Sequence, residues 1–185
     1  LIALNQKGFA IDELVGAAKV MKEKSPRLGV NCINNIDTCG TGGTGLHVFN
    51  CSSAAGIVVA SLDHQVTKHG NKGISSSSGS ADFFSNQGAN IQHDHEKIEA
   101  ILEASNFIFL FAPLHHPAMK FVMDARQSIS EKTIFNLLGP LTNPLSPTSQ
   151  VIGLFSEEYL ERYAIAASRL GINRAAIVHG EDGCD

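Results

Sequence analysis

The chain has 185 residues and a formal net charge of −4, because 18 acidic side chains outnumber 14 lysines and arginines. This balance argues against a general nucleic-acid-binding protein, and an aromatic content of 6% leaves few rings on which single-stranded bases could stack. Hydrophobic residues make up 43% of the chain and charged residues 17%, which excludes a disordered chain and predicts a packed core.

The length fits one large domain, or one domain with a smaller helical piece. The longest apolar run, Phe107 to Leu114, is too short to cross a bilayer, and the chain does not open with a signal peptide, so no membrane contact is expected. The four cysteines form no CxxC pair and no metal-ligand spacing, which predicts reduced thiols in a cytoplasmic protein. Because the chain starts at Leu1 rather than Met and stops at Asp185 directly after a Gly-rich turn, we expect a fragment of a longer chain.

The first elements are a helix and a strand–loop–helix unit. Apolar residues recur at helical spacing from Ile11 to Met21 and predict an amphipathic helix over 10–23, closed by Pro26. A strand at 33–38 is expected to run into a glycine-rich loop at 39–45. Ser52 and Ser53 then favour the start of a helix, whose uniformly apolar continuation to 62 indicates burial on most sides.

The rest of the chain repeats this alternation with different lengths. The pattern predicts a strand at 65–68, a loop at 69–79, helices at 80–88 and 95–105, a strand at 107–111, a helical segment at 115–139 that stops at Gly139-Pro140, a proline-rich linker at 141–150, a strand at 151–155, a helix at 157–170 and a strand at 175–178. Strands that alternate with helices are typical of an α/β fold with a mainly parallel sheet.

The glycine-rich loop is the first candidate binding feature. Gly40, Gly42, Gly43 and Gly45 would let backbone N–H groups approach an anion at the start of the following helix, where Asn50 and the two serines add donors. A tight structural turn explains the glycines equally well. The loop matches neither the P-loop ending nor the GxGxxG spacing.

A second loop favours the anion site. The stretch from Lys68 to Ser80 holds two lysines, one histidine and five serines. Successive loops at the carboxyl ends of parallel strands converge on one crevice, so the two loops together predict a site for a polyanion.

A helical arginine and a histidine pair complete the candidates. Arg126 could hold a carboxylate beside the anion site, although a single helical arginine is more often a surface residue. His115 and His116 are adjacent, point to different faces of a helix and have no third ligand nearby in the sequence, so we assign them no metal role.

Five motifs carry a resemblance to a known family over the whole chain. In matching order and spacing, the sequence resembles anthranilate phosphoribosyltransferases at 40–43 (GTGG), 50–53 (NCSS), 68–71 (KHGN), 79–82 (GSAD) and 133–144 (TIFNLLGPLTNP). The last motif is the most specific of the five.

The resemblance implies an enzyme that joins the amine of anthranilate to carbon 1 of phosphoribosyl diphosphate and releases pyrophosphate, a step of tryptophan biosynthesis. It implies that the diphosphate side is bound by Gly40, Gly43, Thr44, Asn50, Cys51, Ser52 and Ser53, and the phosphoribosyl side by Lys68, His69, Gly70, Asn71, Lys72, Gly73, Ile74, Ser75, Ser76 and Ser80. Anthranilate would contact Gly40, Asn71 and Arg126, and Mg²⁺ would be held by Ser52 and Asp185. No nucleophilic residue is needed, and for His69 we expect an ordering hydrogen bond rather than a role as base.

The family architecture implies a discontinuous helical subdomain at 1–26 and 113–144, and an α/β domain at 33–112 and 145–185 that binds the diphosphate and is incomplete at its C-terminus. It also implies a homodimer. Four positions depart from the family pattern, namely Thr44, Val48, Ser77 and Asp124. These departures keep open a non-catalytic fragment or paralogue that binds phosphorylated ribose. A second alternative is a pyrimidine nucleoside phosphorylase-like enzyme, which is disfavoured because 133–144 matches the transferases and the phosphorylase glycine signature is absent.

Overall fold

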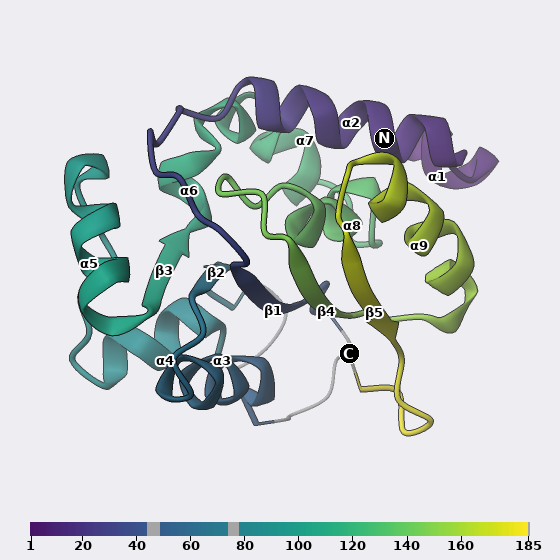
Figure 1. The fold of residues 1–185 in the computed structure, drawn as a ribbon. Helices are drawn as coiled ribbons and strands as arrows, with labels where there is room; N and C mark the ends of the chain where they lie inside the picture. The colour runs from purple at the N-terminus through teal and green to yellow at the C-terminus, as the bar shows by residue number, and fades with distance from the viewer. Residues whose placement is uncertain (44–48, 74–77, 185) are drawn as a thin grey trace.

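A five-stranded parallel sheet forms the centre of the molecule in the computed structural model, which describes residues 1–43, 49–73 and 78–184. Its strands are β1 (Ile36–Gly40), β2 (Val66–Gly70), β3 (Phe107–Phe111), β4 (Ser149–Gly153) and β5 (Arg174–Val178). They lie in the order β3-β2-β1-β4-β5, with every neighbouring pair parallel (Figure 1). The expected α/β class with a parallel sheet is confirmed.

Helices cover the sheet and connect its strands. They are α1 (Ile2–Lys7), α2 (Ile11–Glu23), α3 (Cys51–Ser61), α4 (Ser80–Asn86), α5 (Ile98–Ser105), α6 (Ala112–His115), α7 (Met123–Gln127), α8 (Ile134–Leu141) and α9 (Leu160–Arg169), with 3-10 turns at His95–Lys97, Pro117–Phe121 and Glu157–Tyr159. In Figure 1, α3 and α4 lie below the sheet and α2 and α8 above it. Within the described part of the chain, no helix is both long and apolar enough to cross a membrane.

The main apolar core joins α2, α8 and α9 to the middle of the sheet. Leu14 of α2, Leu137 of α8 and Tyr163 of α9 are fully buried and belong to one cluster with Cys39 of β1 and Ile152 of β4. Two smaller clusters use alternate residues of β3, whose successive side chains point to opposite faces of the sheet. The sheet is therefore buried on both faces around β1 and β2, as parallel sheets usually are.

The first strand lies later than predicted. We expected it at 33–38, whereas β1 begins at Ile36 and ends at Gly40. Asn34 adopts a left-handed conformation (φ 60°), which a strand cannot continue through. At the other end, the ladder between β1 and β4 continues up to Gly40 and Gly153, so Gly40 belongs to the strand rather than to the loop.

The prediction of one helical segment over 115–139 is also wrong. The chain forms α6, a 3-10 turn and α7, and α8 then starts afresh after Thr133, whose backbone N–H donates to Asn136 Oδ1 at 2.9 Å. Pro140 does not stop α8, which includes it and ends at Leu141. A proline in the last turn removes only one helical hydrogen bond, and the Pro140 carbonyl accepts one from Gln150 Nε2 at 2.9 Å.

Smaller differences concern the ends of elements. The helix predicted over 80–88 ends at Asn86 because Gly88 has a positive φ of 80°, and those at 95–105 and 157–170 each begin with a 3-10 turn. The strands predicted at 65–68, 151–155 and 175–178 are β2, β4 and β5, each shifted by one or two residues. Helix α1 was not predicted. The proposed division into a helical subdomain and an α/β domain stays a prediction.

Candidate functional site

The candidate site lies where three strands end. The order of the strands reverses about β1, so the crevice beyond the carboxyl ends of β1 and β4 is the switch point at which doubly wound sheets bind their ligands. The loop after β1 turns there through Gly42 and Gly43, whose φ values of 65° and 78° favour glycine. Thr41 Oγ1 accepts a hydrogen bond from the backbone N–H of Phe155, at 3.0 Å, and so ties this loop to the segment that follows β4.

The second predicted loop is fastened to the start of α4. A side chain at Gly70 would meet Phe109 Cε2 at 2.8 Å and Ser80 Oγ closer still, so only glycine lets Ser80 approach the end of β2. The Asp82 carboxylate accepts hydrogen bonds from the N–H groups of Gly73 and Gly79, both at 2.8 Å. These bonds lower the pKa of Asp82, which organises the loop.

The two loops lie side by side. Asn50, at the start of α3, has its Nδ2 3.4 Å from the Ser78 carbonyl of the second loop. The ammonium of Lys68 donates to the Thr38 carbonyl and, at 3.4 Å, to Ser52 Oγ. The buried Lys68 thus joins β1 to the start of α3, and Asn50 joins the start of α3 to the second loop. A cation beside two such loops suits an anion.

Lys68 is 1% exposed, which makes its charge unusual. Burial lowers the pKa of Lys68, and the neighbouring Asp37 opposes that effect. Asp37 is fully buried, and its pKa is raised by burial and lowered in turn by Lys68 and by donors from Asn143, His69 and Gln150. Ile36 pairs with Val66 in the ladder, so Asp37 is aligned with Thr67 and points to the opposite face of the sheet from Lys68. The two charges still favour each other across the sheet, without a direct ion pair between these two described residues.

His69 is held in an ordering hydrogen bond. Its Nδ1 lies 3.1 Å from the Gly139 carbonyl, which fixes Nδ1 as the donor because a carbonyl can only accept. Burial and the nearby ring of His116, at 5.0 Å between centroids, lower the pKa of His69 to about 3. A histidine with this pKa stays neutral near pH 7 and is a weak general base. His115 and His116 also have their pKa values lowered to about 4, chiefly by burial.

Arg126 lies half-buried on α7, 5.8 Å from the centroid of the Phe135 ring. Among the described residues its guanidinium forms no ion pair. Phe135 and Gly139 are four residues apart on α8 and therefore share one face of that helix. Arg126 thus lies beside α8 at Phe135, and His69 binds the same helix one turn later, at the Gly139 carbonyl.

The described residues alone do not form a magnesium site. Ser52 accepts a hydrogen bond from the Lys68 ammonium, whose charge disfavours a cation held by protein groups at that place. Within the described ranges no group of three His, Cys, Asp or Glu side chains is arranged to hold a metal. Thr44, Ile74, Ser75, Ser76 and Asp185 of the predicted set, together with Val48 and Ser77, lie outside the described residues.

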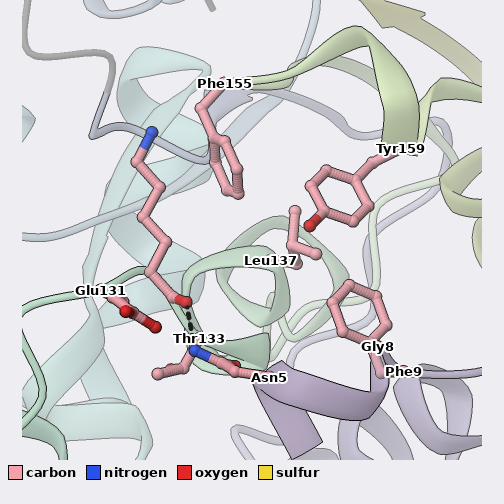
Figure 2. A pocket seen from close by; sticks show the side chains of 9 residues that line it. Asn5, Gly8, Phe9, Glu131, Thr133, Leu137, Phe155 and Tyr159 are labelled. Carbon is pink, nitrogen blue, oxygen red and sulfur yellow. Dashed lines mark hydrogen bonds between the residues drawn. The ribbon is translucent and has the colours of Figure 1, made fainter.

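A cavity of about 210 Å³ lies on the other side of α8 (Figure 2). Phe9, Phe155 and Tyr159 form its aromatic wall, and the ammonium of Lys132 lies 4.0 Å from the centroid of the Phe155 ring. None of the predicted site residues lines this cavity. Its volume is below the roughly 300 Å³ at which ligand pockets begin.

Three residues that organise the site were not predicted as site residues: Asp37, Asp82 and Asn143. A weak signal existed for two of them. Asp37 is an acidic residue inside a strand that is otherwise expected to be buried. Asp82 stands three residues after Gly79, the spacing at which an acidic side chain reaches back to the start of a helix.

Comparison with known proteins decides the family. Residues 33–185 match the family model described as "Glycosyl transferase family, a/b domain". The chain belongs to this family. Its resemblance to anthranilate phosphoribosyltransferases is confirmed: it is 44% identical over its full length to the enzyme of Saccharophagus degradans and 45% identical to that of Metallosphaera sedula, covering 54% and 53% of their lengths.

Solved structures agree with this membership. The anthranilate phosphoribosyltransferase of Thermus thermophilus superimposes with a TM-score of 0.91 at 40% identity, over 98% of this chain and 55% of that one. The Saccharomyces cerevisiae enzyme, in complex with PRPP and Mg, gives a TM-score of 0.88 at 30% identity, over 95% and 50%. The chain therefore spans about half the length of the relatives that it matches.

Proposed function

We propose that the protein transfers the phosphoribosyl group of phosphoribosyl diphosphate to the amine of anthranilate. In this reaction the amine nitrogen forms a bond to carbon 1 of the ribose, the bond from that carbon to the diphosphate oxygen breaks, and pyrophosphate leaves with the electron pair. The amine proton passes to solvent. The observation that carries the proposal is the junction of the two loops around the buried Lys68 at the switch point of the sheet.

The residues would act by binding and orientation. We assign the diphosphate to the loop after β1 and the start of α3, where backbone N–H groups and the helix N-terminus favour negative charge. The phosphoribosyl part would lie against the second loop, with Lys68 beneath it. Such preorganised donors stabilise the leaving negative charge, and no covalent intermediate is required.

Anthranilate would approach from the side of α7 and α8. The charge of Arg126 suits its carboxylate, and Asn71 is exposed at the end of β2. Holding the amine and carbon 1 in line is the remaining task, because alignment of two bound reactants can contribute about 7–11 kcal/mol in favourable systems.

Magnesium belongs to this proposal through the substrate. The yeast relative holds PRPP together with Mg, and we propose that the ion arrives with the diphosphate, with Ser52 and Asp185 nearby. Because the described donors do not form a metal site, we derive no step of the reaction through it. Assembly as a homodimer likewise stays a prediction.

The test is the fluorescence of anthranilate. With phosphoribosyl diphosphate and Mg²⁺ present, the signal should fall with time, and without the diphosphate it should stay constant. An unchanged signal combined with a ligand-induced rise of the melting temperature would favour a non-catalytic binding module. Cleavage of uridine or thymidine by phosphate would favour the phosphorylase alternative, which the relatives do not support.

A further inference from the structure

The motif at 133–144 is the most specific in the sequence, and its last polar residue is Asn143. This side chain is 1% exposed. Its Nδ2 donates to Asp37 Oδ2 at 2.9 Å and to the Thr67 carbonyl at 2.7 Å, and its Oδ1 accepts from the Leu145 N–H at 3.0 Å. All hydrogen-bonding groups of the amide are used, and they join β1, β2 and the turn after α8.

Asp37 gathers the other half of this junction. Besides the bond from Asn143, its carboxylate accepts one from Gln150 Nε2 of β4 and one from the backbone N–H of His69, each at 3.4 Å. Gln150 also binds the Pro140 carbonyl at 2.9 Å. Three central strands and the C-terminal turn of α8 are thus connected through one fully buried carboxylate.

The same turn of α8 makes a second connection to β2. The Gly139 carbonyl binds His69 Nδ1, while Phe135, one turn earlier, lies against Arg126. Helix α8 therefore connects α7, which bears Arg126, to β2, which bears Lys68. Asn143 adds a further contact between the end of α8 and β2, at the Thr67 carbonyl, which directly precedes Lys68.

We propose that Asn143, with Asp37 as its buried acceptor, is a positioning residue. It fixes α8, and with it the neighbouring Arg126, relative to the end of β2, and so aligns the two substrates. This inference rests on the proposed function. Without these hydrogen bonds, each substrate would keep the residues that bind it. The distance and angle between the amine nitrogen and carbon 1 would, however, no longer be fixed. A misplacement of about 1 Å can lower a rate by about 100-fold. The expected signature is a lower kcat with little change in either KM.

The chain supplies a matched control in Asn35. This residue is also 1% exposed, and its Nδ2 also contacts Thr67, at Oγ1 and 3.0 Å, as well as the Leu145 carbonyl at 3.3 Å. Its Oδ1 accepts from the Thr148 N–H at 3.2 Å. Asn35 precedes β1, at the end of the sheet away from the candidate site, and none of these bonds reaches Asp37, His69 or α8.

The experiment compares Asn143→Ala and Asn35→Ala with the wild type in the full natural chain. Both variants remove a buried amide and should lower the melting temperature by similar amounts. Asn143→Ala should lower kcat by about 100-fold with each KM within about threefold, whereas Asn35→Ala should keep kcat within about twofold. If Asn143→Ala does not fold, Asn143→Ser takes its place, since its hydroxyl can still accept from Leu145 N–H but cannot reach Asp37 and Thr67 together.

Three results would overturn the inference. A kcat unchanged in the Asn143 variant, or an equal loss of kcat in Asn35→Ala, would leave Asn143 a purely structural residue. A rise in one KM without loss of kcat would make it a binding residue instead. An inactive wild type would overturn the proposed function itself. An active wild type whose kcat is unchanged by the Asn143 substitution would overturn only this inference.

Discussion

Replacing Gly70 by alanine tests how closely the second loop packs against the sheet. The new Cβ would lie 2.8 Å from Phe109 Cε2 and 3.0 Å from Cζ, whereas carbon atoms normally approach to about 3.5–4.0 Å. Ser80 Oγ can rotate away, but the Phe109 ring is 4% exposed and has little room to move. Overpacking of this kind costs about 1–3 kcal/mol. For a domain of this size, that corresponds to a melting temperature lower by about 3–8 °C.

The control for Gly70→Ala is Gly16→Ala on α2. Gly16 is exposed, and a Cβ there would meet nothing within 4 Å. Alanine is a better helix former than glycine by about 1 kcal/mol, so this variant should melt at a higher temperature. Thermal unfolding followed by circular dichroism measures both. A Gly70→Ala protein as stable as the wild type would refute the close approach of β2 and α4, and combining it with Phe109→Leu should cost less than the sum of the two single substitutions.

Four further variants test the site and its supports. Lys68→Ala should raise the KM for phosphoribosyl diphosphate at least about tenfold, because the buried ammonium contacts Ser52; an unchanged KM contradicts its assignment. Arg126→Ala should raise the KM for anthranilate more than that for the diphosphate, and equal effects would remove Arg126 from the anthranilate side. Asp82→Asn should destabilise the protein at neutral pH. Since hydrogen bonds lower the folded pKa of Asp82, the difference in unfolding free energy from the wild type should shrink as the pH falls below about 4. A difference that does not depend on pH would argue against a role for this carboxylate. Tyr163→Phe removes a 2.7 Å hydrogen bond to the Leu137 carbonyl and should lower the free energy of unfolding by about 1 kcal/mol. Because burial raises the pKa of Tyr163, the tyrosine of the unfolded chain ionises first, and the extra stability of the wild type should decline above about pH 10 in denaturant titrations.

The sequence predicted the fold class through its alternation of strands and helices. The pattern predicted a strand close to each of the five observed ones, although only β3 is apolar throughout. It could not locate their ends: the start of β1 depends on the left-handed Asn34, and its end depends on pairing with Gly153, more than 100 residues away. Long-range pairing of this kind leaves no local pattern. The same holds for Pro140, whose carbonyl bond to Gln150 becomes visible only in three dimensions.

For the site, the sequence indicated which loops converge but not what holds them. Glycines, lysine and hydroxyl residues identified the two loops, and the structure joins them between Asn50 and Ser78. The supporting residues are harder to predict from sequence, because Asp37 and Asn143 are 106 positions apart and meet only in the folded chain. A buried polar pair resembles an ordinary polar residue in the sequence until its partner is known.

The polar residues of β2 also fix the register of this strand, which apolar packing alone does not. Four of its five residues are buried, so no alternation of apolar and polar faces fixes its register against β1 and β3. On one face Lys68 binds the Thr38 carbonyl and Ser52 at the start of α3. On the other face His69 binds Gly139 of α8 through its ring. A shift by one residue would send each side chain to the wrong face and break both bonds, leaving a buried charge without a partner. The same groups that make β2 a binding strand therefore also fix its register.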